Sequence, residues 1–97
     1  MKLVLVSVQF QYADRIASIL EGLEIQDYVR HSRVDGRDSD GRHDGSQVFP
    51  GHVTAFQILV DDEGVKELLE ALREFREGRS TQQHLRAAVV ALEDGLF

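Results

Sequence analysis

Two segments of the chain carry apolar residues at helical spacing, and this arrangement constrains the fold more than any other feature. The first segment covers residues 12–23 and the second runs from 61 to about 77. In both, apolar side chains recur at i, i+3, i+4 and i+7, so each predicted helix must bury one face. The stripes consist of Ile16, Ile19, Leu20 and Leu23 in the first helix, and of Val65, Leu68, Leu69, Leu72 and Phe75 in the second.

Both predicted helices also have signals at their ends. Gly22 and Gly78 predict the two C-terminal ends, since glycine weakens a helix interior and is favoured just beyond a last turn. Residues 61–63 are all acidic. They predict the cap of the second helix and place negative charge at the positive end of its dipole.

Four further segments are rich in β-branched and aliphatic residues, which indicates strands. They cover residues 2–8, 25–34, 53–60 and 85–92. The second is the most polar, which is typical of a sheet edge. The order strand, helix, strand, strand, helix, strand predicts an α+β fold of ferredoxin-like topology (βαββαβ). In that topology two helices cover one face of a four-stranded antiparallel sheet. We expect residues 1–97 to form one domain.

Residues 35–51 interrupt this pattern between the second and third strands. The segment contains four Gly, four Asp and the one Pro of the chain. Such a composition cannot bury a core and predicts a flexible loop. A loop of this length is unusual in a small domain, and loops of this kind usually carry function.

The first and last strands are apolar on both faces. In the first, Leu3 and Leu5 alternate with valines at positions 4, 6 and 8. Two helices cover only one face, so a monomer would expose the other apolar face to water. We therefore expect self-association. The last strand has Leu85, Ala87, Val89 and Ala91 on one side and Ala88, Val90 and Leu92 on the other.

Composition excludes several classes of function. The net charge is −6, which argues against nucleic acid as a partner, since phosphate neutralisation needs clustered Lys and Arg. The chain has no cysteine, so disulfides and thiol nucleophiles are excluded. No apolar run approaches the 20 or so residues of a membrane helix, and we expect a cytoplasmic protein without membrane insertion. We find no catalytic constellation and expect no enzyme activity.

In length, element order and the 35–51 loop the chain resembles the PII-like signalling proteins, the short branch of the nitrogen regulatory protein P-II superfamily. The sequence Gly45-Ser46-Gln47-Val48-Phe49-Pro50-Gly51 before the third strand adds to the resemblance. It implies a homotrimer that binds a small effector, often an adenine nucleotide, in clefts between subunits. It also implies a role in nitrogen regulation, with the long loop signalling to a protein partner such as a transporter or an enzyme.

The chain departs from the nitrogen-regulatory members at two places. The 35–51 loop has no Tyr, so their tyrosine modification has no acceptor here. Their phosphate loop after the second helix contains Gly and Lys, whereas residues 77–83 here contain one Gly and no Lys. The identity of the effector therefore stays open, with an adenine nucleotide or another anion as the candidates.

The candidate ligand-binding residues lie where the loops join the strands and helices. Arginine suits phosphate or carboxylate because its planar guanidinium donates in pairs. The other interpretation is that these arginines balance nearby acids. The predicted set consists of Arg33, Arg37, Gly51, His52, Gly78 and Arg79.

Two alternative functions follow from other features. His43 lies near Asp40 and Asp44 and could ligate a divalent ion, as in a trimeric metal-binding protein of the cation-tolerance type. However, no His pair has the spacing of a known metal motif, and we predict no metal ligand. The second alternative is a small enzyme of the ferredoxin-like dimeric type.

Overall fold

The computed structural model describes residues 1–38, 41–43, 52–78 and 84–97 of the chain. The first half contains a long strand, a single 3₁₀ turn and a helix, and the second half contains a long strand and a longer helix. The elements are β1 (Lys2–Gln9), η1 (Phe10–Tyr12), α1 (Ala13–Gly22), β2 (Tyr28–Val34), β3 (Gly36–Asp38), β4 (Gly41–His43), β5 (Val53–Val60), α2 (Asp62–Glu77) and β6 (Arg86–Ala91).

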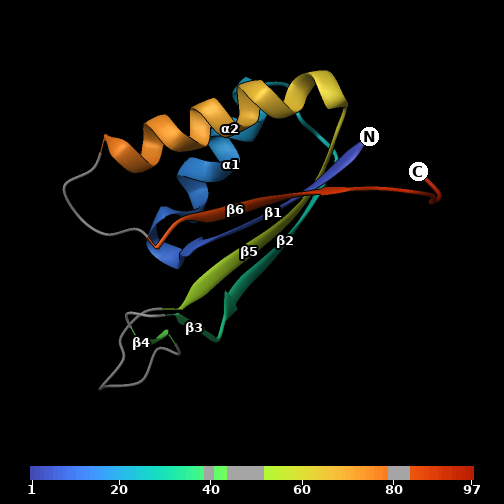
Figure 1. Cartoon of the computed structure of the whole chain (residues 1–97). Coiled ribbons are helices and arrows are strands. Elements are labelled where there is room, and N and C mark those ends of the chain that lie inside the picture. Colours follow the sequence, from blue (N-terminus) through green and yellow to red (C-terminus); the bar gives the residue numbers. More distant parts are fainter. Residues whose placement is uncertain (39–40, 44–51, 79–83) are drawn as a thin grey trace.

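In the described part of the chain, the four longer strands form one antiparallel sheet in the order β2-β5-β1-β6. Both helices lie on the same side of this sheet, and β6 and β2 are its edges (Figure 1). The predicted ferredoxin-like fold is thereby confirmed. The sheet order follows from right-handed crossovers, since each helix connects two strands that are separated by one other strand.

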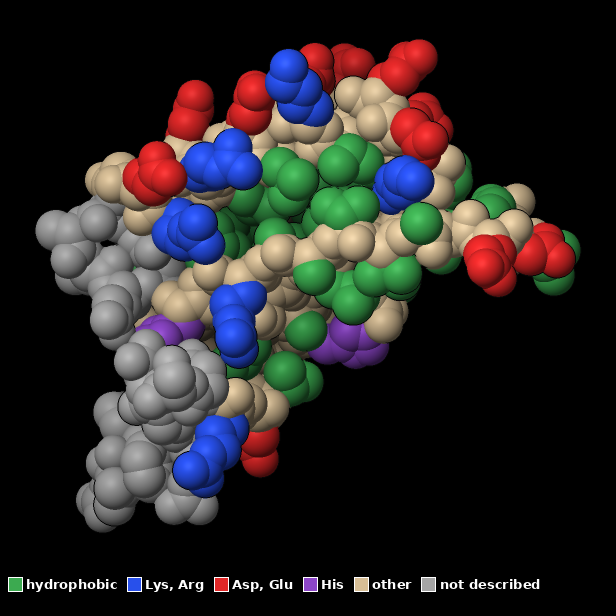
Figure 2. Space-filling view, viewed as in Figure 1, with side chains coloured by type: hydrophobic (Ala, Val, Ile, Leu, Met, Phe, Trp, Pro, Cys, Tyr) green, Lys and Arg blue, Asp and Glu red, His purple; other side chains and the backbone are tan. Residues whose placement is uncertain are grey.

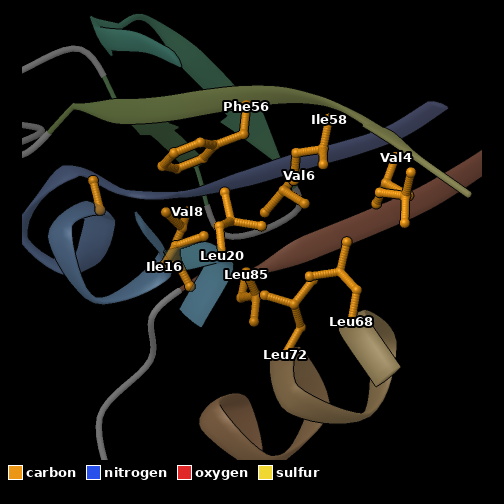
Figure 3. Packing of buried hydrophobic residues seen from close by; sticks show 12 residues of the cluster. Val4, Val6, Val8, Ile16, Leu20, Phe56, Ile58, Leu68, Leu72 and Leu85 are labelled. Carbon is orange, nitrogen blue, oxygen red and sulfur yellow. The ribbon is translucent and has the colours of Figure 1, made fainter. Parts of the chain in front are cut away.

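The core lies between the sheet and the two helices (Figure 3). The strands contribute alternate residues, which include Val6 from β1 and Phe56 from β5, a cross-strand pair in the register. Ile16 and Leu20 of α1 and Leu68 and Leu72 of α2 are almost fully buried against them. Full burial of each such side chain is worth about 1.5–3 kcal/mol, so these two helical faces hold the helices on the sheet.

The helix ends follow the sequence signals, with one difference. α1 ends at Gly22 and Gly78 is the C-terminal cap of α2, as predicted. Asp61 occupies the N-terminal cap of α2, but its side chain makes no capping hydrogen bond. Asp62 instead accepts a 2.8 Å hydrogen bond from the Met1 amine. That hydrogen bond and the amine's positive charge lower the pKa of the Asp62 carboxyl.

The second strand is shorter than predicted, beginning at Tyr28 rather than Ile25. Residues 24 and 25 belong to the connection that follows α1. Glu24 has a φ of 60° there, and the Ile25 amide donates to the Leu20 carbonyl. Near its other end the register shifts between His31 and Val34, and Arg33 there has a φ of 55°. This bulge changes the direction of the chain where it leaves the sheet.

Part of the predicted 35–51 loop forms regular structure. β3 and β4 pair as an antiparallel ladder with Gly36 opposite His43 and Arg37 opposite Arg42. Backbone hydrogen bonding can form such a ribbon without a hydrophobic pattern, which is why composition alone predicted only a loop. Most of the remainder of 35–51 lies outside the described residues. In the part of the chain that is described, no helix is long and apolar enough to cross a membrane.

Candidate functional site

The sheet face opposite the helices is apolar over its central part. On β1, Leu3 pairs with Leu59 of β5 and Val90 of β6, and the next position on this face, Leu5, pairs with Gln57 and Ala88. Leu5 and Val90 are each 40% exposed, and Val29 on the β2 edge is 53% exposed. The alternation predicted from the sequence is therefore present. We call this surface, made by Leu3, Leu5, Val29, Ala55, Gln57, Leu59, Ala88 and Val90, the open face.

Figure 2 shows hydrophobic side chains on both sides of β6. Those beside the helices belong to the core and its margin. Those on the other side belong to the open face, where the described part of the chain places no element over them. Contiguous apolar surface of this kind marks an interaction site in a soluble protein.

The open face becomes polar toward the start of β6. Ser7 of β1 pairs there with Ala55 of β5 and with Arg86 of β6. A pocket of about 250 Å³ lies at this end, between the sheet and the segment that leads from β2 into β3. We call it the basal pocket. Its walls are formed by Ser7, Val34, Asp35, Gly36, Arg37, Val53, Ala55, His84 and Arg86.

The basal pocket continues onto the open face. A second hollow of about 530 Å³ shares Ser7, Ala55 and Arg86 with it. That hollow extends over Leu5, Gln57 and Ala88 toward His31 on β2. The two hollows together form one groove that is polar at the base of the 35–51 segment and apolar toward the middle of the sheet.

The basal pocket combines two guanidinium groups with one carboxylate. Arg37 and Arg86 are both exposed, and neither has an ion-pair partner among the described residues. Ser7 adds a hydroxyl, His84 an imidazole and Asp35 the opposing negative charge. Guanidinium groups and a hydroxyl can donate several hydrogen bonds to one anion. The pocket therefore has the donors for a phosphate or a carboxylate, in a protein whose net charge is −6.

The structure separates the predicted ligand-binding residues into groups. Arg37 lies in the basal pocket. Arg33 and His52 both contact the ring of Phe10, at centroid distances of 5.3 Å for the guanidinium carbon and 6.3 Å for the imidazole. The Phe10 amide also donates to the His52 carbonyl at 2.9 Å. Arg33 thus makes a cation–π contact and His52 an edge-to-face contact with Phe10, just after β1, and the role of both residues as ligands stays a prediction.

Of the other predicted residues, the structure describes only Gly78, at the C-terminal end of α2. The Gly78 amide donates to the Glu74 carbonyl at 2.9 Å, so this N–H closes the helix. Gly51 and Arg79 lie outside the described residues, so their predicted role is untested. Sequence reasoning did not include Ser7, His84 or Arg86. Arg86 could have been identified from the sequence, because it is a cation at the start of an otherwise apolar strand. Which residue lies beside it on the neighbouring strand depends on the register of the sheet.

The metal alternative gains no support from the described residues, which contain no group of three His, Asp or Glu side chains able to hold an ion. The side chains proposed for it from the sequence, at 40, 43 and 44, lie outside that description. The described residues form a pocket with hydrogen-bond donors for an anion, beside an apolar face.

No protein-family model matches the sequence, and no curated protein matches it. Solved structures do resemble it. CPII, a nitrogen regulatory PII-like protein from Thiomonas intermedia K12 bound to ADP, AMP and bicarbonate, matches with a TM-score of 0.72 and 18% identity. The match covers 92% of this chain and 88% of CPII.

Two other solved structures show the same likeness. A DUF3240-family protein from Shewanella baltica has a TM-score of 0.71 and 16% identity, over 99% of this chain and 94% of that one. A PII-like signalling protein from Thermus thermophilus has a TM-score of 0.68 and 19% identity, over 91% and 82%. The resemblance stated from the sequence is confirmed at the level of the fold, which is that of the PII-like proteins.

Proposed function

From the fold it shares with the PII-like proteins, we propose that this chain is a PII-like regulatory protein rather than an enzyme. It binds a small anionic effector in the basal pocket, assembles as a homotrimer through the open face, and signals to a protein partner through residues 35–51. The carrying observation is the position of the pocket, which is lined by Arg37 at the start of the 35–51 segment and by Arg86, which also lines the hollow on the apolar face.

The pocket is suited to a regulator because part of its wall belongs to the signalling segment. Val34, Asp35, Gly36 and Arg37 connect β2 to β3 and line the pocket directly. A bound anion that contacts Arg37 favours the arrangement of this segment in which that contact forms. Differential affinity for two arrangements is sufficient to shift their populations. A transporter or an enzyme that recognises one arrangement would then respond to the effector.

Self-association would complete the site. The basal pocket and the open face share residues, so a second subunit seated on the open face would also border the pocket. Exclusion of water strengthens the interaction between a guanidinium and an anion, because the local dielectric falls. This supports a cleft between subunits as the place of binding. CPII was solved with ADP, AMP and bicarbonate, and these three compounds are the first effectors to test.

Calorimetric titration of the purified chain with ADP, AMP, ATP, bicarbonate and inorganic phosphate tests effector binding. We expect saturable binding of at least one of these anions with one site per chain. Thermal shifts measured with divalent metals form a separate arm of the experiment. Metal binding that is lost in His43→Ala and His52→Ala, together with no anion binding, would support the metal-binding alternative instead.

Arg86→Ala and Arg37→Ala are each expected to weaken binding of that anion about 10- to 100-fold, since a hydrogen bond to a charged group contributes about 1.5–3 kcal/mol. Raising the salt concentration should weaken the wild-type interaction as well. Arg15→Ala is the matched control, because Arg15 is exposed on α1 away from the pocket. Equal affinity in Arg15→Ala, Arg37→Ala and Arg86→Ala would place the anion elsewhere.

A further inference from the structure

A second groove lies on the helix side of the sheet, between α2 and β6. It has a volume of about 100 Å³ and is lined by Leu69, Leu72, Arg73, Arg76, Leu85 and Ala87. The four α2 residues have the spacing i, i+3, i+4 and i+7, so they share one face of the helix. The groove therefore combines three leucines and one alanine, of which Leu72 and Leu85 are almost fully buried, with two arginines on its helical wall.

The two arginines leave this wall positively charged. Arg73 and Arg76 are exposed, and within the described residues neither has an ion-pair partner. Glu70 and Glu74 are each displaced by one residue from the groove positions, so they lie on a neighbouring face of the helix. In Figure 2 many Asp and Glu side chains lie along the upper edge of the molecule, and Lys and Arg side chains lie among and below them, next to the apolar surface above β6.

The segment that follows β6, residues 92–97, has the complementary character. It contains Glu93 and Asp94, followed by Leu96 at 100% exposure and Phe97 at 71%. A bend at Glu93 and Asp94 lies between the two halves, and the Gly95 amide donates to the Asp94 carboxylate at 2.8 Å. The Phe97 ring lies against Gly95, where a Cβ would come within 2.8 Å of it. The segment thus presents two acids and two apolar side chains that the described part of its own chain does not cover.

The segment cannot reach the groove of its own chain. Ala87 lines the groove near the start of β6, and residue 92 lies five positions further on, about 16 Å away at the rise of a strand. Leu96 lies four residues beyond residue 92, and four extended residues span at most about 14 Å, which is less than the distance back to the groove. In Figure 1 the segment extends beyond the sheet, at the end of the molecule opposite the C-terminal end of α2.

We infer that the 92–97 segment docks into the α2–β6 groove of a second copy of this chain. Leu96 fills the apolar floor, and a groove of this volume suits one aliphatic side chain. Glu93 and Asp94 pair with Arg73 and Arg76 on the wall. Since each copy carries both a segment and a groove, a closed symmetric assembly can satisfy every segment. This contact is distinct from the open face, because Ala87 lies on the helix side of β6 opposite Val6.

Site-directed disulfide crosslinking tests the inference. Because the chain has no cysteine of its own, any disulfide that forms must involve the introduced cysteines. One chain carries Ala87→Cys and a second, of different tag length, carries Leu96→Cys. Mixing the two under mild oxidation is expected to give a disulfide-linked pair of unlike chains as the main product. Glu70→Cys replaces Ala87→Cys in the matched control, since Glu70 is exposed on the outer face of the same helix. Equal yields from the two positions, or no unlike pair, would overturn the inference.

Charge exchange provides an independent measurement. Arg73→Glu alone and Glu93→Arg alone should each lower the yield of the unlike pair at least several-fold, because like charges then meet in the groove. Combining the Arg73→Glu change in the groove chain with the Glu93→Arg change in the segment chain should restore it. Both residues are exposed, and circular dichroism checks that each variant stays folded. A yield that is indifferent to charge would contradict the pairing of acids with arginines.

Effector binding and this contact can fail independently. The docking groove and the basal pocket share no residue, so a positive crosslink with no anion binding would retain this inference and reject the proposed effector site. Anion binding with no crosslink would do the reverse.

Discussion

Leu5→Asp is expected to abolish the assembly and leave chains of 11.0 kDa. Leu5 lies at the centre of the open face, between Gln57 on one neighbouring strand and Ala88 on the other. Burial of a leucine in an interface is worth about 1.5–3 kcal/mol per copy, and an unpaired carboxylate there costs several kcal/mol more. Because the side chain is 40% exposed in the single chain, the fold tolerates the change while the interface does not.

Light scattering coupled to gel filtration measures the result. The unmodified chain should have three times the subunit mass, and Leu5→Asp should have the mass of one subunit. Ser18→Asp is the control, since Ser18 is exposed on α1 and the change adds the same charge. A monodisperse monomer for the unmodified chain would refute the homotrimer. An assembly that survives Leu5→Asp would show that other contacts, such as the one proposed between the 92–97 segment and the α2–β6 groove, hold the copies together without the open face.

Phe56→Ala is expected to lower the free energy of unfolding by about 3–5 kcal/mol. Phe56 is 1% exposed at the centre of β5, the strand that pairs with both β1 and β2. Its ring also contacts Tyr28 at a centroid distance of 5.9 Å and lies 5.7 Å from the Arg30 guanidinium carbon. Removal of the ring creates a cavity that the sheet cannot close. It also removes the ring that contacts the Tyr28 and Arg30 side chains of β2.

Urea denaturation followed by circular dichroism measures this loss. The transition midpoint should fall strongly with little change in slope, since the surface exposed on unfolding is nearly the same. Val29→Ala serves as the control, because Val29 is apolar and lies on the same β2–β5 pair but is 53% exposed. A loss for Phe56→Ala as small as the loss for Val29→Ala would show that the ring is not part of the stabilising core. Both variants should be compared at one protein concentration, since assembly also contributes to stability.

Much of the fold could be predicted because its signals are local. The helical stripes identified Ile16, Leu20, Leu68 and Leu72, and all four are almost fully buried. The strand at 53–60 has the predicted bounds, since alternation of apolar and polar residues is a property of neighbouring positions. The start of β2 could not be predicted in this way. The apolar Ile25 looks like a strand residue, but its amide is bound to the preceding helix.

The candidate site could be predicted only in part, for the opposite reason. Arg37 was found because it lies in an unusual segment, and the resemblance to PII-like proteins directed attention to that segment. Ser7 and Arg86 lie near opposite ends of the chain, and each is unremarkable in the sequence. They form one wall of the basal pocket because β1 and β6 pair in a particular register, and a shift of one residue would place them on opposite faces of the sheet.

The sequence by itself therefore determined the two helices, the four longer strands, the buried stripes and the presence of a second apolar face, since periodicity and composition act over a few neighbouring residues. Only the tertiary structure decided what lies at the two ends of that face and beside β6. It placed Arg37 and Arg86 in one pocket, turned Arg33 and His52 toward Phe10, and left Leu96 beyond the reach of its own groove. These arrangements depend on strand register and on the direction in which each segment leaves the sheet. Neither property can be predicted from a pattern of neighbouring residues.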